Sequence, residues 1–299
     1  MKTRTILRTS TLVLTCAALC GLLSQAFAAG PVDDALSAFK AGEYEKSVEI
    51  ASKVADGDAL HAQALYLVGE AELARGRFAE AKQAFEAVLA AKKDSVPALT
   101  GLGRAQTGAG EREAAQKTLR RAIQLDAKDA QPRRALGEAL LAAGDDDGAI
   151  KELEAAWKLD GKDALTARAL VEAHLRKGSV DAASKVATAF SQTAPKSAMA
   201  WFLKGLVLDR KGEASDAIDA YEKAVAADDK FLDALRNLAV VYTTSNAMYS
   251  NPKKVEKASE YVHRYVELGG TDKRLLELLD QIQGFLDELK QGGGGGRGR

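Results

Sequence analysis

Cysteine is nearly absent from this chain of 299 residues, and both examples, Cys16 and Cys20, lie within the first 28 residues. If that segment is removed, no thiol remains for a disulfide or for thiol catalysis. Histidine is also scarce, and the three histidines lie far apart and outside any HExxH motif. No phosphate-binding loop, dinucleotide-binding motif or GxSxG motif is present. We therefore expect no enzyme, no catalytic residue, no metal site and no cofactor.

An excess of charge of one sign is missing as well. The chain has 42 basic and 42 acidic residues, and loss of residues 1–28 would remove three basic and no acidic ones, leaving a net charge of −3. Duplex nucleic acid binds to strongly positive surfaces, so we expect no nucleic-acid partner. After residue 28 no apolar run approaches the ~20 residues that a membrane span requires, so we expect no transmembrane segment there.

Residues 1–28 have the pattern of a secretory signal peptide. Lys2, Arg4 and Arg8 precede an apolar stretch at 11–23, which is followed by the small-residue exit that ends at Ala28. We expect cleavage after Ala28, export and a periplasmic location. A lipoprotein anchored through Cys20 (or Cys16) and an extracellular protein are the alternatives, and an uncleaved anchor is disfavoured because the apolar run is short.

Glycine recurs with a period of 34 residues along the chain. The six positions in step are Gly42, Gly76, Gly110, Gly144, Gly178 and Gly212, and Asn246 falls on the seventh. A fixed period in the thirties indicates a solenoid of repeated helix pairs. Glycine, and next asparagine, suits the left-handed backbone conformation at the end of a helix, so we expect positive φ at these positions.

Small and large residues occupy fixed places around each glycine. Seven residues before it the chain has mostly glycine or alanine, and five residues after it alanine recurs. The clearest unit has Trp201, Gly205, Gly212, Ala217, Tyr221 and Ala224. This pattern resembles the tetratricopeptide repeat (TPR), whose unit is 34 residues of helix–turn–helix. The resemblance implies an all-α, TPR-type α-solenoid, a right-handed superhelix of helical hairpins. Asp126, Asp160 and Asp228 lie in the turns between units, where we expect helix caps.

The period divides the chain into segments. After the signal peptide at 1–28, residues 29–268 hold about seven units: 31–61, 62–95, 96–129, 130–163, 164–197, 198–231 and 232–268. The seventh carries a loop insertion at 247–253. We expect residues 271–290 to follow as a capping helix with an apolar stripe, and residues 291–299 to be a disordered Gly/Arg tail.

In this family the first helix of each unit lines a concave groove, and the resemblance therefore implies a partner-binding surface. Candidate residues stand ten or six residues before each glycine of the series or before Asn246, and Asn237 is added as the neighbour of Arg236. The set is Tyr66, Arg104, Arg134, Glu138, Arg168, Glu172, Phe202, Leu206, Arg236 and Asn237. The arginines could meet carboxylates of a partner while Phe202 and Leu206 hold an apolar anchor. Alternatively, each arginine pairs with the glutamate one turn later and Phe202 packs on the next unit.

These observations favour one function class. We expect a non-catalytic, monomeric scaffold or adaptor of the bacterial cell envelope that binds a protein or peptide partner in the groove. A self-assembling structural protein of the envelope and an accessory or polysaccharide-binding subunit of an envelope enzyme complex are the alternatives.

Overall fold

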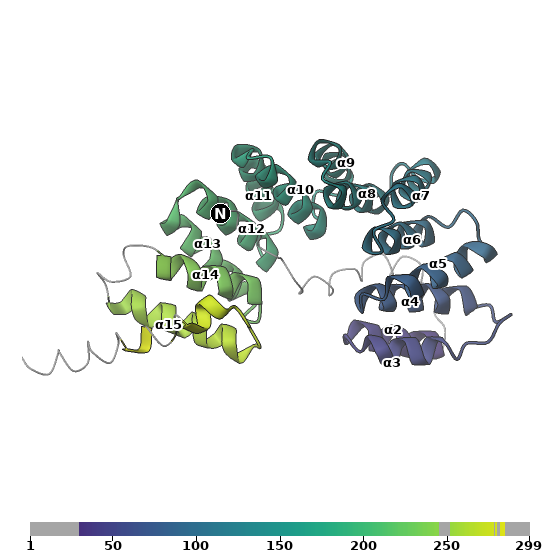
Figure 1. Cartoon of the computed structure of the whole chain (residues 1–299), viewed down its shortest axis with the longest axis horizontal. Helices are drawn as coiled ribbons and strands as arrows, with labels where there is room; N and C mark the ends of the chain where they lie inside the picture. Colours follow the sequence, from purple (N-terminus) through teal and green to yellow (C-terminus); the bar gives the residue numbers. More distant parts are fainter. Residues whose placement is uncertain (1–29, 245–251, 278, 280–281, 285–299) are drawn as a thin grey trace, which may run out of the picture. The chain divides into compact units, whose positions relative to one another are not determined.

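The computed structural model describes residues 30–244, 252–277, 279 and 282–284, and all regular structure in these residues is helical. The chain divides into two compact units, 1–160 and 161–299, and each is described by itself. In both units, successive helices pack as antiparallel hairpins (Figure 1).

Unit 1 contains four such hairpins. Its helices are α2 (Pro31–Lys40), α3 (Tyr44–Ala51), α4 (His61–Ala74), α5 (Phe78–Ala91), α6 (Val96–Gly108), α7 (Arg112–Leu125), α8 (Ala130–Ala143) and α9 (Asp146–Leu159). The first helices of the hairpins, α2, α4, α6 and α8, contact one another in sequence and are called the inner helices here. The second helices pack chiefly on inner helices, so the row of inner helices forms the closer-packed side of the stack.

Unit 2 repeats this arrangement. Its helices are α10 (Ala164–Arg176), α11 (Val180–Thr193), α12 (Ala198–Lys211), α13 (Ala214–Ala227), α14 (Leu232–Thr244) and α15 (Pro252–Glu267). Its inner helices are α10, α12 and α14, with contacts from α12 to each of the others. A further helical stretch at 273–277 buries Leu275 but leaves Leu276 38% exposed. Most of the expected insertion at 247–253, Asn246 and the end of the expected capping helix lie outside the described residues.

The six glycines of the 34-residue series all have positive φ, between 72° and 86°, which confirms the prediction from their spacing. Gly144 illustrates the reason. It ends α8 in the left-handed conformation, with φ 86° and ψ 9°, and its N–H donates to Leu141 O at 3.1 Å. Any other L-residue would be strained there, although no neighbouring atom crowds the position.

Glycines within the inner helices serve close packing. A Cβ atom at Gly103 would lie 2.4 Å from Leu119 Cγ, and one at Gly137 would lie 2.5 Å from Leu153 Cγ. In each pair the glycine and the leucine belong to the two helices of one hairpin. The leucine side chain fills the space that the glycine leaves open, and the two helices can therefore pack closely. In the fifth repeat the sizes are exchanged: buried Val171 and Ala187 hold the glycine and leucine positions. Volume is thus conserved across the helix pair.

The three aspartates expected as helix caps in the turns between repeats, Asp126, Asp160 and Asp228, are C-cap residues rather than N-cap residues. Asp126 and Asp228 lie at helix C-termini, where each Oδ1 accepts the N–H two residues later, from Lys128 at 2.9 Å and Lys230 at 3.0 Å. The N-cap is instead three residues further on: Asp129 accepts from Gln131 N at 2.9 Å. The first aspartate therefore closes the turn and the second begins the helix.

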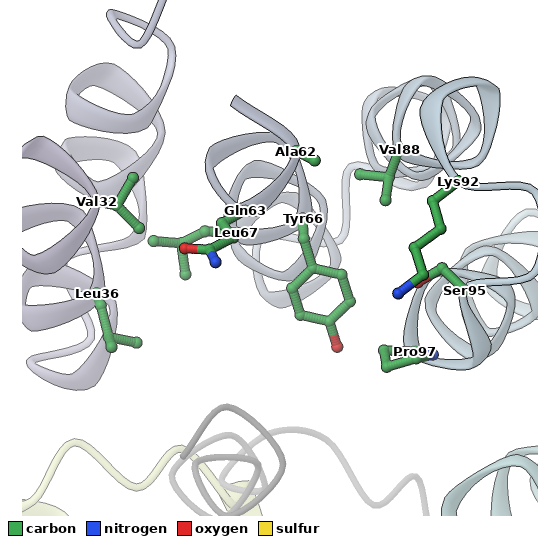
Figure 2. Close-up of a pocket in the computed structure, with 10 residues that line it drawn as sticks. All are labelled: Val32, Leu36, Ala62, Gln63, Tyr66, Leu67, Val88, Lys92, Ser95 and Pro97. Carbon is green, nitrogen blue, oxygen red and sulfur yellow. The ribbon is translucent and has the colours of Figure 1, made fainter. Parts of the chain in front are cut away.

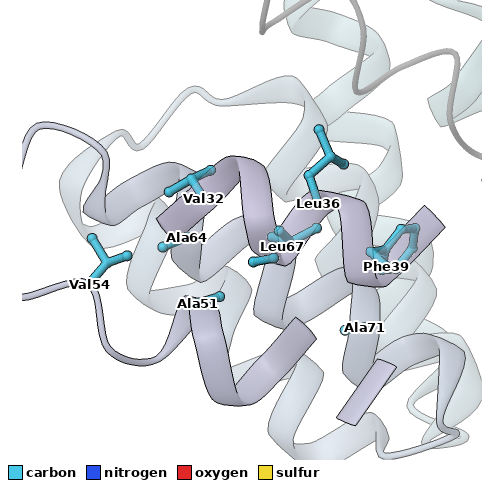
Figure 3. Close-up of a cluster of buried hydrophobic side chains, with 9 residues drawn as sticks. Val32, Leu36, Phe39, Ala51, Val54, Ala64, Leu67 and Ala71 are labelled. Atoms are coloured by element: carbon cyan, nitrogen blue, oxygen red, sulfur yellow. The ribbon is translucent and has the colours of Figure 1, made fainter. Parts of the chain in front are cut away.

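The apolar core runs between the helix layers. In the first two repeats the buried cluster joins side chains of α2, the α3 region and α4 (Figure 3). Its buried members are Val32, Ala35, Leu36, Phe39, Ala51, Val54, Ala64, Leu67 and Ala71. Buried Ser47 satisfies its hydroxyl by donating to Ala35 O at 2.8 Å. The core fixes the spacing of α2 and α4, whose remaining faces form the candidate site.

Candidate functional site on the inner helices of unit 1

A cavity of about 210 Å³ opens between the inner helices of unit 1 (Figure 2). Side chains of α2, α4, the end of α5 and the start of α6 line it: Val32, Leu36, Ala62, Gln63, Tyr66, Leu67, Val88, Lys92, Ser95 and Pro97. The wall is mostly aliphatic, and four residues bring polar groups to it. Ligand pockets for small molecules commonly measure ~300–1,000 Å³, so this cavity has the size for a side chain or two.

Tyr66 lies at the centre of this cavity, between side chains of α2 and those of Val88, Lys92 and Pro97 (Figure 2). Its ring meets that of Phe85 edge to face, with centroids 5.6 Å apart. Phe85 in turn lies where Gly69 and Gly101 have no side chains, since a Cβ at Gly101 would be 2.4 Å from Phe85 Cζ. Two glycines on neighbouring inner helices therefore seat Phe85, and Phe85 supports Tyr66.

Burial raises the pKa of Tyr66 well above its usual value, and the negative charge of nearby Glu70 raises it further. The phenol is therefore a neutral hydrogen-bonding group at physiological pH. It offers a polar tip on an apolar wall, as tyrosines at binding surfaces commonly do.

The acidic and basic side chains beside Tyr66 are paired with each other. Arg104 of α6 donates to both oxygens of Glu70 of α4, at 3.0 and 2.9 Å. Glu70 is 4% exposed, and its charge is the main cause that raises the pKa of Arg104. On α8, Arg134 donates to Glu138 one turn later at 2.9 Å. The Arg134–Glu138 pair agrees with the pairing interpretation, whereas Arg104 pairs across repeats.

Phe202 is not available to a partner, which corrects its interpretation as an exposed anchor. It is 4% exposed, and its ring lies 5.9 Å from that of Tyr221 and 5.1 Å from that of Phe231, centroid to centroid. Helix α12 turns this side chain into the contact with α13 and the start of α14, because a buried aromatic cluster removes more apolar surface from water than an exposed ring would. The structure thus supports the packing alternative for Phe202.

Arg236 and Asn237 of α14 make contacts within unit 2. Arg236 donates through Nε to Asp272 Oδ2 at 2.8 Å, and its Nη2 lies 2.6 Å from the same oxygen. Asn237 Nδ2 donates to the buried Tyr221 hydroxyl at 3.3 Å. Both residues therefore stabilise the end of unit 2, which is a role that their position in the repeat did not indicate.

The other candidates in unit 2 are partly buried: Arg168, Glu172 and Leu206. Arg168 is close enough to Asp233 to lower the pKa of that carboxyl, although burial outweighs it and raises the pKa overall. The structure therefore places Arg168 near an acidic residue of α14 and does not bring it together with an apolar anchor at Phe202.

Lys92, Gln63 and Ser95 line the cavity but were not among the candidates from the sequence. Lys92 follows the end of α5, outside the inner helices, and is exposed. Its side chain has no hydrogen-bond or ion-pair partner among the residues that the structure describes. The 34-residue pattern does not predict a role for Lys92, because the pattern does not show that the turn after α5 brings this side chain to the cavity beside α6.

Other kinds of site are not found in the described part of the chain. Within residues 30–244 and the described residues that follow, no group of histidine, cysteine, aspartate and glutamate side chains is placed to hold a metal ion. Nor is any helix there long and apolar enough to cross a membrane. Asp145, which opens a run of three aspartates, caps α9 by accepting from Gly148 N at 2.9 Å.

Helical hairpins of 34 residues that stack through glycine and alanine columns define an α-solenoid. Two family models, both described as tetratricopeptide repeat, match residues 72–139 in one case and residues 32–96 and 168–230 in the other, together more than half of the chain. The chain belongs to the tetratricopeptide-repeat family, and the predicted fold class is confirmed.

Solved structures share this fold. One is the crystal structure of the APC/C hetero-tetramer Cut9–Hcn1, with TM-score 0.60 and 19% identity over 84% of this chain and 48% of that chain. Another is a tetratricopeptide repeat protein from Parabacteroides merdae ATCC 43184, with TM-score 0.59 and 13% identity over 85% of this chain and 97% of that chain. The chain spans about half the length of the Cut9–Hcn1 chain that it matches. No curated protein sequence matches the chain.

Proposed function

We propose that the chain is a non-catalytic scaffold that binds a peptide or helix of a protein partner against the inner helices of unit 1. Tetratricopeptide-repeat proteins generally mediate protein–protein interactions, and the family match supports that class of function. The observation that carries the location is the apolar cavity between α2, α4 and α6, with Tyr66 at its centre.

Unit 1 is favoured over unit 2 as the binding site because its apolar side chains line an open cavity. The aromatic residue that the sequence offered in unit 2, Phe202, is buried in the core. In unit 1, aliphatic side chains and the Tyr66 hydroxyl line an open cavity, and such apolar pockets are where binding energy concentrates in protein interfaces. The site lies on packed helices, so it is preformed and little ordering cost accompanies binding.

We further propose that the protein is exported to the bacterial envelope and acts in the periplasm. The basic, apolar and small-residue segments of residues 1–28 support this location. Mass spectrometry of the product from cells that make the full chain should find a protein that begins at Ala29. An intact residue 1, or a lipid on Cys20, would contradict the cleavage expected after Ala28.

Site-specific photo-crosslinking in cells tests the binding function. A photoreactive residue at Gln63, which is exposed beside the cavity, should yield discrete adducts with a partner. The matched control is the same residue at Lys117, which is exposed on the second-row helix α7 and should give none of these adducts. Identical adducts at both positions, or none at either, would contradict a partner at the inner helices.

A further inference from the structure

We propose that the cavity on unit 1 recognises a peptide segment in which a large apolar side chain is accompanied by a nearby carboxylate. This inference rests on the proposed function and specifies its partner: the apolar side chain enters the cavity, and the carboxylate pairs with Lys92. The argument follows from the lining of the cavity and from the charges around it.

The apolar part of the cavity selects the anchor. Val32, Leu36 and Leu67 form one side and Val88 and Pro97 the other, with Tyr66 between them (Figure 2). At about 210 Å³ the space suits a leucine, methionine or phenylalanine side chain. Burying such a side chain removes apolar surface from water and so stabilises a complex.

The charge at the cavity is positive. Lys92 is the charged residue of the lining, and no acidic residue lines the cavity. Acids around the cavity have partners of their own: Glu70 accepts two hydrogen bonds from Arg104, and Asp94, two residues after Lys92, accepts from Arg121 at 2.8 Å. Asp129, whose charge also acts on Tyr66, caps α8 by accepting from Gln131 N at 2.9 Å. A ligand carboxylate would therefore find a cation with no partner among the described residues.

The uncharged polar groups fit the same ligand. The Ser95 hydroxyl and the Gln63 amide lie at the cavity, and Ser95 makes no capping bond to its own helix. Both can donate to a peptide carbonyl or to the carboxylate itself. A basic ligand would instead bring its charge next to Lys92 without an acid to receive it.

Selection of displayed random 12-residue peptides on the chain without residues 1–28 tests the inference. The wild type should enrich peptides that hold an apolar residue with Asp or Glu at a fixed spacing. Lys92→Glu should change the enriched acid to Lys or Arg at that spacing. The matched control, Lys93→Glu, alters an exposed neighbouring lysine that does not line the cavity and should leave the preference unchanged.

Binding of one selected peptide, measured by fluorescence anisotropy, gives a second readout. Lys92→Glu should weaken binding about tenfold, because attraction between close charges becomes repulsion. Ala62→Trp, which fills the cavity, should weaken it at least as much, whereas Ala91→Trp on the exposed end of α5 should leave it within about twofold.

Three results would overturn the inference. Enriched peptides without an acid, or equal effects of Lys92→Glu and Lys93→Glu, would contradict recognition of a peptide carboxylate by Lys92. Unchanged binding to Ala62→Trp would remove the cavity as the site. If crosslinked adducts still form at Gln63 in these cases, the proposed scaffold function is retained and only the peptide preference is wrong. If no peptide is enriched and no adducts form at Gln63, both the preference and the proposed function are contradicted.

Discussion

Arg104 donates hydrogen bonds to both carboxylate oxygens of Glu70, and the two residues occupy the same position in successive repeats, 34 residues apart. The bond therefore joins neighbouring inner helices directly. Glu138, at the equivalent position one repeat later, also raises the pKa of Arg104. Opposite charges at equivalent positions thus hold neighbouring inner helices together beside Tyr66.

Arg104→Met should destabilise unit 1 by about 1.5–3 kcal/mol, because it leaves the carboxylate of Glu70 buried without its partner. The double variant Glu70→Met/Arg104→Met should be more stable than Arg104→Met alone, since it removes the unpaired charge as well. Urea unfolding followed by circular dichroism measures both. Arg120→Met on exposed α7 is the control, with an expected effect within about 0.5 kcal/mol. A double variant less stable than the single one would contradict the pairing.

Gly137→Val should cost about 1–3 kcal/mol, because the added side chain would overlap Leu153. Combining it with Leu153→Ala should recover part of the loss, since the double variant reproduces the Val171 and Ala187 arrangement of the next repeat. A double-mutant cycle on urea midpoints gives the coupling energy between the two positions. Additive losses would mean that these positions do not exchange volume.

At Gly144, substitutions should rank by their tolerance of positive φ. Gly144→Asn should be milder than Gly144→Ala, and Gly144→Val worse than both, with the alanine change costing ~1–2 kcal/mol. The position is open, so clashes do not confuse the ranking. Gly148 is a poor control because a Cβ there would lie 2.3 Å from Asp145 Oδ2 and would disturb the cap of α9. Thermal melts that place alanine above asparagine would refute the backbone argument.

Phe202→Ala should destabilise unit 2 by about 3–5 kcal/mol, as expected for loss of a buried aromatic side chain. A partner-binding anchor would behave differently, since its loss would weaken binding and leave stability intact. Leu206→Ala, at a half-buried position of the same helix, should cost less. Chemical denaturation distinguishes the two interpretations, and an unchanged midpoint for Phe202→Ala would restore the binding interpretation.

Stability should fall in alkaline solution as tyrosines ionise. Burial, together with the charge of Glu222, raises the pKa of Tyr261 to about 12 from an ordinary value of 10.0. A pKa that is higher in the folded state contributes stability that is complete below pH 10 and is lost as the pH rises through about 12. Tyr261→Phe should therefore lose less stability between pH 8 and pH 11 than the wild type, as measured by urea midpoints. Parallel losses in both proteins would contradict this contribution.

Periodicity predicted the parts of the fold that each repeat determines for itself. Gly144 needs positive φ whatever surrounds it, and Gly137 must be small because Leu153 is large, so both follow from local spacing. The spacing placed aspartate caps in these turns but did not assign them to a helix end, because Asp126 and Asp129 are both suitable residues in one turn. Only the backbone geometry shows which of them receives the first N–H groups of α8.

The candidate site was less predictable because it depends on which side chains compete for burial. Tyr66 and Phe202 hold equivalent positions in their repeats, yet Tyr66 borders a cavity and Phe202 is enclosed by Tyr221 and Phe231. The difference comes from Phe231, directly before α14, because its counterpart four repeats earlier, in the turn near Tyr66, is the small residue Ser95. Such compensation between repeats is invisible to a pattern that treats all repeats alike.

The Glu70–Arg104 bond also limits how this chain can change in length. Repeat arrays grow and shrink by whole repeats, and removal of residues 96–129 would preserve every glycine and alanine column. It would also delete Arg104 and bring Glu138, which already pairs with Arg134, to the position beside Glu70. Glu70 would then face another carboxylate in place of the arginine that binds both of its oxygens. The repeats are therefore interchangeable in shape but ordered in charge.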